Sequence, residues 1–329
     1  GTAWHAALSG REVAGEVDWE SGEQTKVVAR LAQLHIPRPV SQIEPEAPLQ
    51  TAQQRLPSLD LSAEDFVFED KALGRVAVRA EREPSGWNLK QLEIANPDSK
   101  LSLTGKWFLE KSARTEVDVQ LDISDLGKFF GRLGWPDTVR GGKATVKGPL
   151  RWSGGLMRLD VPTLSGKIRL EAKNGRFRQI EPGIAKLLGI LSLQALPRRI
   201  SLDFKDVFNK GYSFDSVAAD VDFFLGAATT DNFLMQGPAA RVAMRGQVGL
   251  ASETQNLNIR VTPSVSDTVS VAGAIINPVV GIAALIAQKA LNDPLGQLAT
   301  FEYSVTGTWS VPIVEQVKQA AAGPPAGGR

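Results

Sequence analysis

The sequence contains no cysteine, only two histidines and no hydrophobic run long enough to cross a bilayer. The absence of cysteine excludes disulfides, thiolate nucleophiles and cysteine-ligated metal sites, and it leaves the redox compartment open. His5 and His35 stand in separate segments, so a histidine-rich metal site or a Ser-His-Asp array would lack partners. We therefore expect both histidines to be structural, and we expect neither a metal site nor a cofactor.

The sequence also lacks an excess of charge of either sign. Lys plus Arg number 37 and Asp plus Glu 36 among 329 residues, which gives a net charge of +1. The charges are interleaved along strand-like segments and do not gather into a basic face, which argues against nucleic acid as a partner. The chain opens at "GTAWHAALSG", inside a strand pattern and without methionine. We expect a piece of a longer polypeptide with its targeting segment upstream.

Sequence motifs of catalysis are missing as well. Neither G-x-S-x-G, G-x-G-x-x-G nor a complete Walker sequence occurs, and "RGGKATVKG" lacks the Ser or Thr that would follow Lys143. Asp220 with Asp222 and Glu116 with Asp118 are paired carboxylates at a spacing of two, which places each pair on one face of a strand. A polar outer face explains them better than an acid/base pair. The sequence predicts that the chain is not an enzyme.

Glycines recur on the apolar side of alternating strands. In "ARVAMRGQVGL", Val242, Met244, Gly246, Val248 and Leu250 share one face because successive strand side chains point to opposite sides. A glycine kink lets a sheet curl, so the repetition predicts a sheet curled with its apolar face inward. An ordinary sandwich, in which glycines make room for a facing tryptophan, is the alternative. The six glycines in this position are Gly15, Gly105, Gly148, Gly166, Gly246 and Gly307.

Turn signals and proline content divide the chain into four parts. Residues 1–36 are predicted to be the end of a preceding β-repeat, in which "TKVVARLAQLHIP" fits either a strand or a short helix. Residues 37–58 form a proline-rich connector. Residues 59–318 form the main β-region, beginning with an antiparallel meander, and residues 319–329 are expected to be a disordered tail.

Three short helices interrupt the strands. The first, at 124–134, has Ser124 as its N-cap candidate. The second, at 183–196, is apolar nearly all round, and the third, at 278–292, begins at Pro278. At about 15 residues each, the two longer helices cannot span a bilayer, which needs roughly 20. Three helices are too few to cover so many apolar strands, so the sheet packs on itself or something other than protein covers it.

Three long segments carry a resemblance to a known family. They begin at "DLGKFFGRLGWPDTVRGGKATVKG", "LSGKIRLEAKNGRFRQIEPGIAKLLGILSLQALPRRISLDF" and "GPAARVAMRGQVGLASETQNLNIRV". They resemble the C-terminal part of AsmA-like envelope proteins of the YhdP type, from about Leu59 to Pro312. The resemblance implies a mainly β fold with a few short helices: a long, curled antiparallel sheet that forms an open groove with an apolar interior and capping helices.

The resemblance also implies a function and a place in the cell. Such proteins are anchored in the inner membrane of diderm bacteria, extend through the periplasm and let phospholipid pass to the outer membrane. We expect this chain to be part of such a bridge, shielding acyl chains in its groove, with outer-membrane contact at its C-terminal end and with unidentified envelope proteins as partners. The expected groove residues are Leu101, Leu103, Trp107, Val146, Leu150, Ile168, Leu170, Val242, Met244, Val248 and Leu250.

Two alternatives stay open at this stage. The apolar helices either cap the open end of the sheet or dip into a membrane leaflet with arginines near lipid phosphates. The residues concerned are Leu187, Leu188, Leu191, Arg198, Arg199, Ile282 and Leu285. The whole chain could instead be an envelope scaffold or an outer-membrane protein assembly factor, with sheet edges that pair with other strands and no lipid transport.

Overall fold

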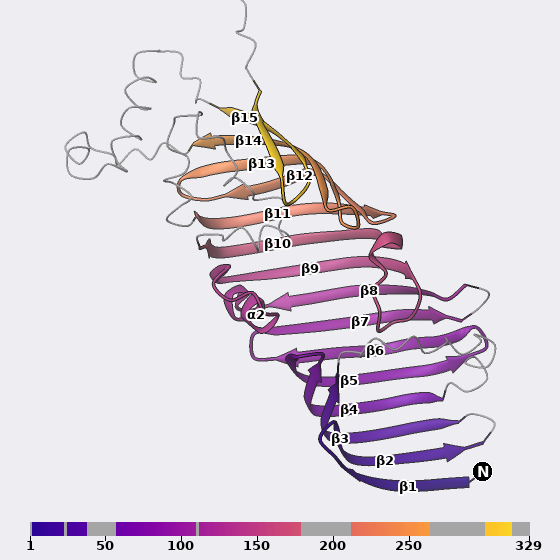
Figure 1. The fold of residues 1–329 in the computed structure, drawn as a ribbon. Coiled ribbons are helices and arrows are strands. Elements are labelled where there is room, and N and C mark those ends of the chain that lie inside the picture. Colours follow the sequence, from indigo (N-terminus) through magenta and orange to yellow (C-terminus); the bar gives the residue numbers. More distant parts are fainter. Residues whose placement is uncertain are drawn as a thin grey trace, which may run out of the picture.

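A computed structural model describes residues 2–22, 25–37, 57–109, 112–178, 212–263 and 300–317. Their sixteen strands form one sheet in which spatial order follows chain order from β1 to β16 (Figure 1). The strands are β1 Thr2–Ser9, β2 Val13–Ser21, β3 Lys26–Ile36, β4 Ser58–Phe68, β5 Lys71–Glu83, β6 Gly86–Asn96, β7 Ser99–Phe108, β8 Arg114–Ile123, β9 Val139–Ser153, β10 Ser165–Phe177, β11 Tyr212–Phe224, β12 Ala227–Gln236, β13 Ala240–Gly249, β14 Thr254–Pro263, β15 Phe301–Gly307 and β16 Pro312–Gln316.

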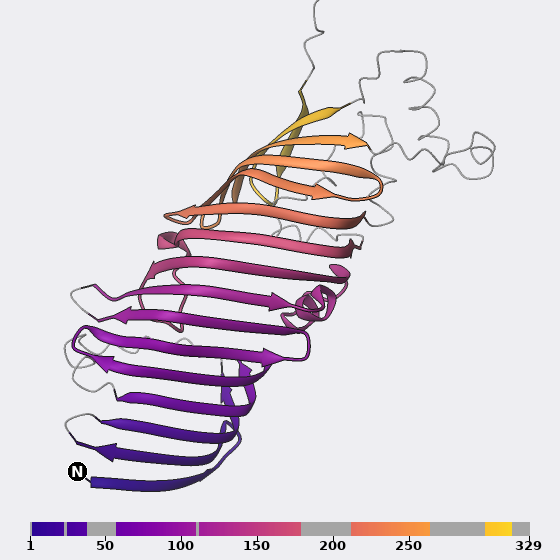
Figure 2. The same ribbon diagram turned by 180° about the vertical axis from the view of Figure 1, so that it is seen from behind.

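The sheet is open, because β1 and β16 lie at opposite ends of the strand order and do not pair. Figures 1 and 2 show a long sheet whose strands curve across their length. The predicted fold, a curled β-sheet that forms an open groove, is therefore confirmed. The segment "TKVVARLAQLHIP", for which strand and helix were both open, forms β3.

One pair of neighbours departs from the predicted antiparallel arrangement. β3 and β4 run parallel, from Lys26 opposite Ser58 to Ile36 opposite Phe68, whereas every other neighbouring pair is antiparallel. Parallel neighbours need a connection long enough to carry the chain back across the sheet, and the proline-rich segment between these strands has that length. Strands β1–β3 thus belong to the same sheet as the rest; their assignment to a preceding repeat stays a prediction.

The two faces of the sheet differ in chemistry, as the alternation predicts. The outer face carries cross-strand ion pairs, such as Lys167 with Asp222 at 3.4 Å and Arg169 with Asp220 at 3.4 Å. The interpretation of these carboxylates as a polar outer face is consistent with these partners. Apolar side chains occupy the inner face, in three overlapping clusters that follow one another along the sheet: one from β2 to β6, one from β4 to β11 and one from β8 to β16.

The inner-face glycines have backbone angles that other residues rarely adopt. Gly105 has φ of 151°, and a Cβ there would lie 2.1 Å from the Glu116 carbonyl oxygen on β8. Gly246 has φ of 136°, and its Cβ would lie 2.2 Å from the Asn256 oxygen. The missing side chain would thus point along the sheet into the neighbouring backbone. Room for a facing tryptophan does not explain these glycines, since backbone atoms are the nearest neighbours at Gly15, Gly105, Gly148, Gly166, Gly246 and Gly307.

Shifts in pairing register accompany several of these glycines. The register shifts between Ala14 and Gly15 on β2, and again on β6 beside the partner of Gly105. A third shift on β12 begins at Thr230, the partner of Gly246. An extra residue in one strand bends it and increases its twist, and glycine permits the sharp local angle. The register shifts and the glycines together curve the sheet.

Helix α2, Leu126–Arg132, lies along one edge of the sheet between the end of β8 and the start of β9 (Figures 1 and 2). Its N-cap is Asp125, whose carboxylate accepts a hydrogen bond from the Lys128 amide at 3.1 Å. The prediction of Ser124 as N-cap was wrong by one residue. The Ser124 hydroxyl instead donates to the Asp98 carbonyl at 3.2 Å, because it precedes the cap and faces the turn between β6 and β7.

Two helices predicted from the sequence, at 183–196 and 278–292, lie outside the described residues. Their candidate cap or membrane residues lie there too: Leu187, Leu188, Leu191, Arg198, Arg199, Ile282 and Leu285. The roles proposed for them stay predictions. Within the described ranges, no helix is long and apolar enough to cross a membrane.

Candidate lipid-binding groove

The inner face is covered to different degrees along the sheet. On β7, β9 and β10 the expected groove residues are half-buried, so part of each side chain is accessible. Protein atoms therefore leave apolar surface open in the middle of the sheet. These half-buried residues are Leu101, Leu103, Trp107, Val146, Leu150, Ile168 and Leu170.

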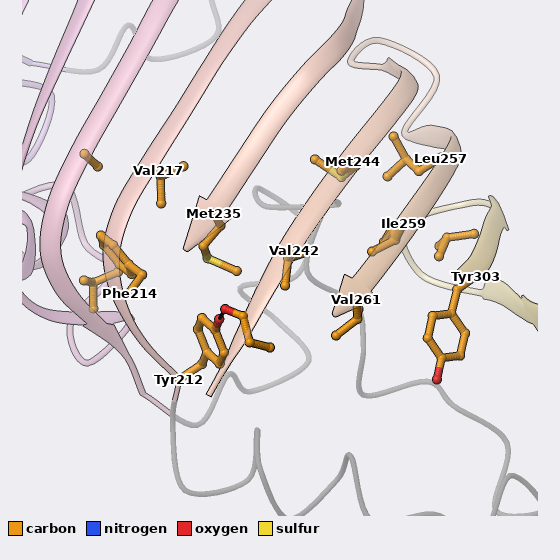
Figure 3. Packing of buried hydrophobic residues seen from close by; sticks show 14 of the residues in the cluster. Tyr212, Phe214, Val217, Met235, Val242, Met244, Leu257, Ile259, Val261 and Tyr303 are labelled. Atoms are coloured by element: carbon orange, nitrogen blue, oxygen red, sulfur yellow. Dashed lines mark hydrogen bonds between the residues drawn. The ribbon is translucent and has the colours of Figure 1, made fainter. Parts of the chain in front are cut away.

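Toward the C-terminal end the inner face is closed by side chains. Val242, Met244 and Val248 on β13 are 4%, 4% and 7% exposed. Figure 3 shows Met244 and Val242 beside Leu257 and Ile259 of β14, on the same side of the strands. Of the expected groove residues here, only Leu250, in the turn after β13, is half-buried. Their assignment to a lipid path stays a prediction, and the packing places Val242, Met244 and Val248 in a protein core.

The ends of the strands form two long margins of the sheet. The margin at which β2, β7, β9 and β15 end is called the tryptophan rim, and the opposite margin, where α2 lies, is called the helix rim. Six of the seven tryptophans stand at or just beyond the strand ends of the tryptophan rim: Trp4, Trp19, Trp87, Trp107, Trp152 and Trp309. Tryptophan favours positions where one side is apolar and the other is wet.

Four residues of this rim are direct cross-strand neighbours. Trp87 pairs with Trp107, Trp107 with Thr115, and Thr115 with Trp152, across β6 to β9. We call this set the tryptophan ladder. The Trp87 and Trp107 rings meet edge to face at 5.6 Å, and Thr115 is fully buried and donates its hydroxyl to the Gly154 carbonyl at 2.9 Å. The ladder closes the outer margin of the half-exposed apolar face.

A segment between β9 and β10 lies over the ladder. This strap, residues 154–164, includes the short 3-10 helix η1, Val161–Thr163. Leu164 is 5% exposed and belongs to the cluster from β4 to β11, against which Leu156 packs. Met157 and Leu159 are 58% and 51% exposed. The sequence patterns predicted no role for the strap or for Trp87. Their role depends on which strands meet at one rim, and strand patterns do not reveal the pairing order.

Acidic and basic groups at the helix rim serve the fold. Asp98, 2% exposed, accepts hydrogen bonds from Arg132 of α2, and this interaction raises the pKa of the arginine. The Arg132 guanidinium also donates to the Ala72 carbonyl at 3.0 Å. This ion pair holds α2 against the turn between β6 and β7.

The histidines and tyrosines do not form a reactive cluster. Asp18 hydrogen bonds to His5 at 2.7 Å and raises the pKa of this exposed imidazole, and His35 lies 3.4 Å from Asp65. Burial raises the pKa of Tyr212 to about 12, although its hydroxyl donates to the Ala240 carbonyl at 2.5 Å. Among the residues that the structure describes, no three His, Asp or Glu side chains gather as a metal site would require.

An open, curled sheet with a half-buried apolar strip and a tryptophan-lined margin defines a class of groove-forming β-proteins. Comparison with known sequences narrows this class. A family model described as YhdP protein matches residues 1–314, and the chain therefore belongs to this family. The match includes the strands before the proline-rich connector.

A curated relative supports the same assignment. The intermembrane phospholipid transporter YhdP of Escherichia coli (strain K12) is 32% identical over 225 residues, which cover 67% of this chain. The chain spans only 18% of that relative's length. No solved structure matches.

Proposed function

We propose that this chain is a section of a conduit that carries phospholipid between the inner and outer membranes of a diderm bacterium. The observation that carries the proposal is the half-exposed apolar strip on β7, β9 and β10 of an open sheet, in a family whose curated member is named an intermembrane phospholipid transporter. The strip would shield acyl chains while headgroups stay in water. Each methylene kept from water contributes about 0.8 kcal/mol.

Such a conduit needs no catalytic group. Lipid movement along a continuous apolar strip requires only that binding be similar at successive positions, so that no single site traps the lipid. The described part of the chain fits this requirement, since ion pairs engage charged side chains on the outer face and at the helix rim. We therefore propose a binding and transport role, in the periplasm, as part of a longer inner-membrane-anchored protein.

Site-specific photo-crosslinking tests the proposal. A photoreactive amino acid at Ile168, half-buried on the inner face, is expected to label phospholipid in cells. The same amino acid at Lys167, the preceding residue and exposed on the outer face, serves as the matched control and should label none. Mass spectrometry of gently purified protein should find phospholipid bound.

A photoreactive amino acid at Met244 separates two roles: labelling of lipid would support its predicted place in the lipid path, and no labelling would agree with its packing in the C-terminal core. A chain that copurifies with no phospholipid and labels equally little at Ile168 and Lys167 would contradict the proposal. That result would favour the envelope scaffold, whose sheet edges bind other proteins.

A further inference from the structure

Three buried polar atoms at the tryptophan rim lack hydrogen-bond partners. Across the described ranges, the buried side-chain atoms without a partner are Trp107 Nε1, Gln255 Oε1 and Trp309 Nε1. All three residues stand at the tryptophan rim, at the end of β7, the start of β14 and just after β15. Buried polar groups are nearly always paired, so each exception needs an explanation.

Trp107 differs from its neighbours in the tryptophan ladder. The Trp87 ring N–H donates to the Pro57 carbonyl at 2.8 Å, and the Trp152 ring N–H donates to the Gly155 carbonyl at 3.1 Å. The Trp107 ring N–H, between them, has no acceptor. The described part of the chain therefore holds a buried donor that no protein acceptor uses.

The strap covers this donor without pairing it. A Cβ at Gly155 would lie 3.6 Å from Cζ2 and 3.8 Å from Cε2 of Trp107, and Cε2 is bonded to Nε1. The strap thus shields the ring edge with Gly155, whose carbonyl is already engaged by Trp152. Removing the strap from this position would expose the donor at the margin of the apolar strip.

The strap is anchored at both ends. At its start the Gly154 amide donates to the Ala113 carbonyl at 2.8 Å, and the Gly154 carbonyl accepts from the Thr115 hydroxyl at 2.9 Å. Gly154 has φ of 96° and no neighbour within 4 Å of an added Cβ. The other end is fixed: the Thr163 hydroxyl donates to Asp160 at 2.6 Å, and the Gly226 amide donates to the Leu164 carbonyl at 3.0 Å. Between these anchors, Leu156 packs against the apolar cluster and the Gly155 carbonyl accepts from the Trp152 ring N–H, so lifting residues 155–159 costs the Leu156 contacts and this one hydrogen bond.

We propose that Trp107 is a binding subsite for the ester or phosphate oxygens of a glycerophospholipid, occupied when the strap lifts. This inference rests on the proposed function. An indole N–H only donates, so its partner must offer an acceptor oxygen. A molecule that also covers the adjacent Leu103 and Leu150 must be apolar next to that oxygen, and a glycerophospholipid joins both properties at its glycerol backbone. The lipid then lies with its chains toward the helix rim and its headgroup outside the tryptophan rim.

Nuclear magnetic resonance of the indole N–H groups tests the inference on the full chain. Trp107→Phe identifies the resonance by its loss, and titration of the wild type with dioctanoyl phosphatidylethanolamine should shift that resonance downfield. Trp107→Phe should weaken lipid binding about fivefold, the loss of one hydrogen bond. Trp135→Phe, at the helix rim, is the matched control and should bind lipid as the wild type does.

Further experiments identify which lipid oxygen accepts the hydrogen bond and distinguish failure of the subsite from failure of the proposed function. With a diether phospholipid, a retained shift assigns the acceptor to the phosphate, and a lost shift assigns it to the ester carbonyl; both support the subsite. Because Trp107→Phe also removes the larger indole ring from beneath the strap, the melting temperature of the lipid-free variant is measured first, and binding is compared at a temperature at which both proteins are folded. Binding that is unchanged in Trp107→Phe, with an unshifted resonance, overturns the subsite and leaves the proposed function standing. A wild type that binds no phospholipid overturns both.

Discussion

At the scale of single residues, backbone angle decides which positions of the strands must be glycine. At Gly105 the neighbouring backbone stands where a side chain would begin, 2.1 Å away at the Glu116 oxygen and 2.7 Å away at the Val117 Cα. Backbone cannot retreat as a flexible side chain does, so both the conformation and the space require glycine.

Gly105→Ala should therefore destabilise the chain by about 2–4 kcal/mol. Urea unfolding followed by circular dichroism measures the change. Gly131→Ala is the matched control: Gly131 lies in α2, nothing lies within 4 Å of its added Cβ, and alanine favours helix. The control should be neutral or stabilising, and equal losses in the two variants would contradict the argument.

Tyr212 predicts a loss of stability at high pH. Its pKa is raised to about 12 from an ordinary value of 10.0, chiefly because burial disfavours the phenolate. The unfolded chain releases this proton first, so the contribution is complete below pH 10.0 and is lost as the pH rises to about 12. We expect the free energy of unfolding to fall by about 1–2 kcal/mol through this range, after allowance for solvent screening.

Urea unfolding at a series of alkaline pH values, compared between wild type and Tyr212→Phe, measures this contribution. The variant should lose the part of the pH dependence that belongs to Tyr212. Tyr303→Phe is the comparison variant, because burial raises the pKa of this second tyrosine as well, and it should lose a smaller part. A slope unchanged in Tyr212→Phe would contradict the assignment.

At the scale of elements, the sequence predicted the strands and their inward faces. It did not predict how neighbouring strands pair or which inner positions stay accessible. Alternation in "ARVAMRGQVGL" indicates which residues of β13 face inward, and the structure buries Val242, Met244 and Val248 as that pattern requires. Alternation does not tell whether a neighbouring strand runs parallel, and so the β3–β4 pair was missed. It also cannot tell which inner positions stay open, because Ile168 and Val242 have the same pattern and differ only in what packs over them.

The N-cap of α2 was predicted one residue too early. Ser124 and Asp125 are both good N-cap residues, and sequence preference does not choose between them. The geometry chooses Asp125, whose carboxylate reaches the Lys128 amide. Asp125→Ala should cost about 1 kcal/mol in urea unfolding, and Ser124→Ala less than half of that. The reverse order would restore Ser124 as the cap.

At the scale of the whole molecule, burial differs along the sheet and is lowest in its first strand. Seven of the eight residues of β1 are exposed, and Trp4 and Leu8 are among the exposed large hydrophobic residues. In β14, by contrast, Leu257, Ile259 and Val261 are 1%, 4% and 1% exposed. The half-buried strip on β7, β9 and β10 follows well-covered strands, since Ala80 on β5 and Leu89 on β6 are 1% and 2% exposed.

Hydrogen exchange should follow the difference in burial between the first strands and β13–β14. Local opening requires less free energy where few apolar contacts are lost, so amides of β1 and β2 should exchange much faster than those of β13 and β14. Mass spectrometry of peptides from the intact chain gives both rates in one experiment. Similar protection at the two ends would show that the sheet opens as one unit, contrary to this expectation.

The single-file order of the strands decides how the molecule bears tension. Neighbouring strands are about 4.8 Å apart, so the roughly fifteen steps from β1 to β16 extend about 72 Å along the curved sheet. A pull between these ends acts along the interstrand hydrogen bonds and across the covalent backbone direction. The mechanical resistance of the sheet is therefore lowest along the direction in which its strands follow one another. Under such a pull the strands would separate one at a time, beginning with the five-residue β16.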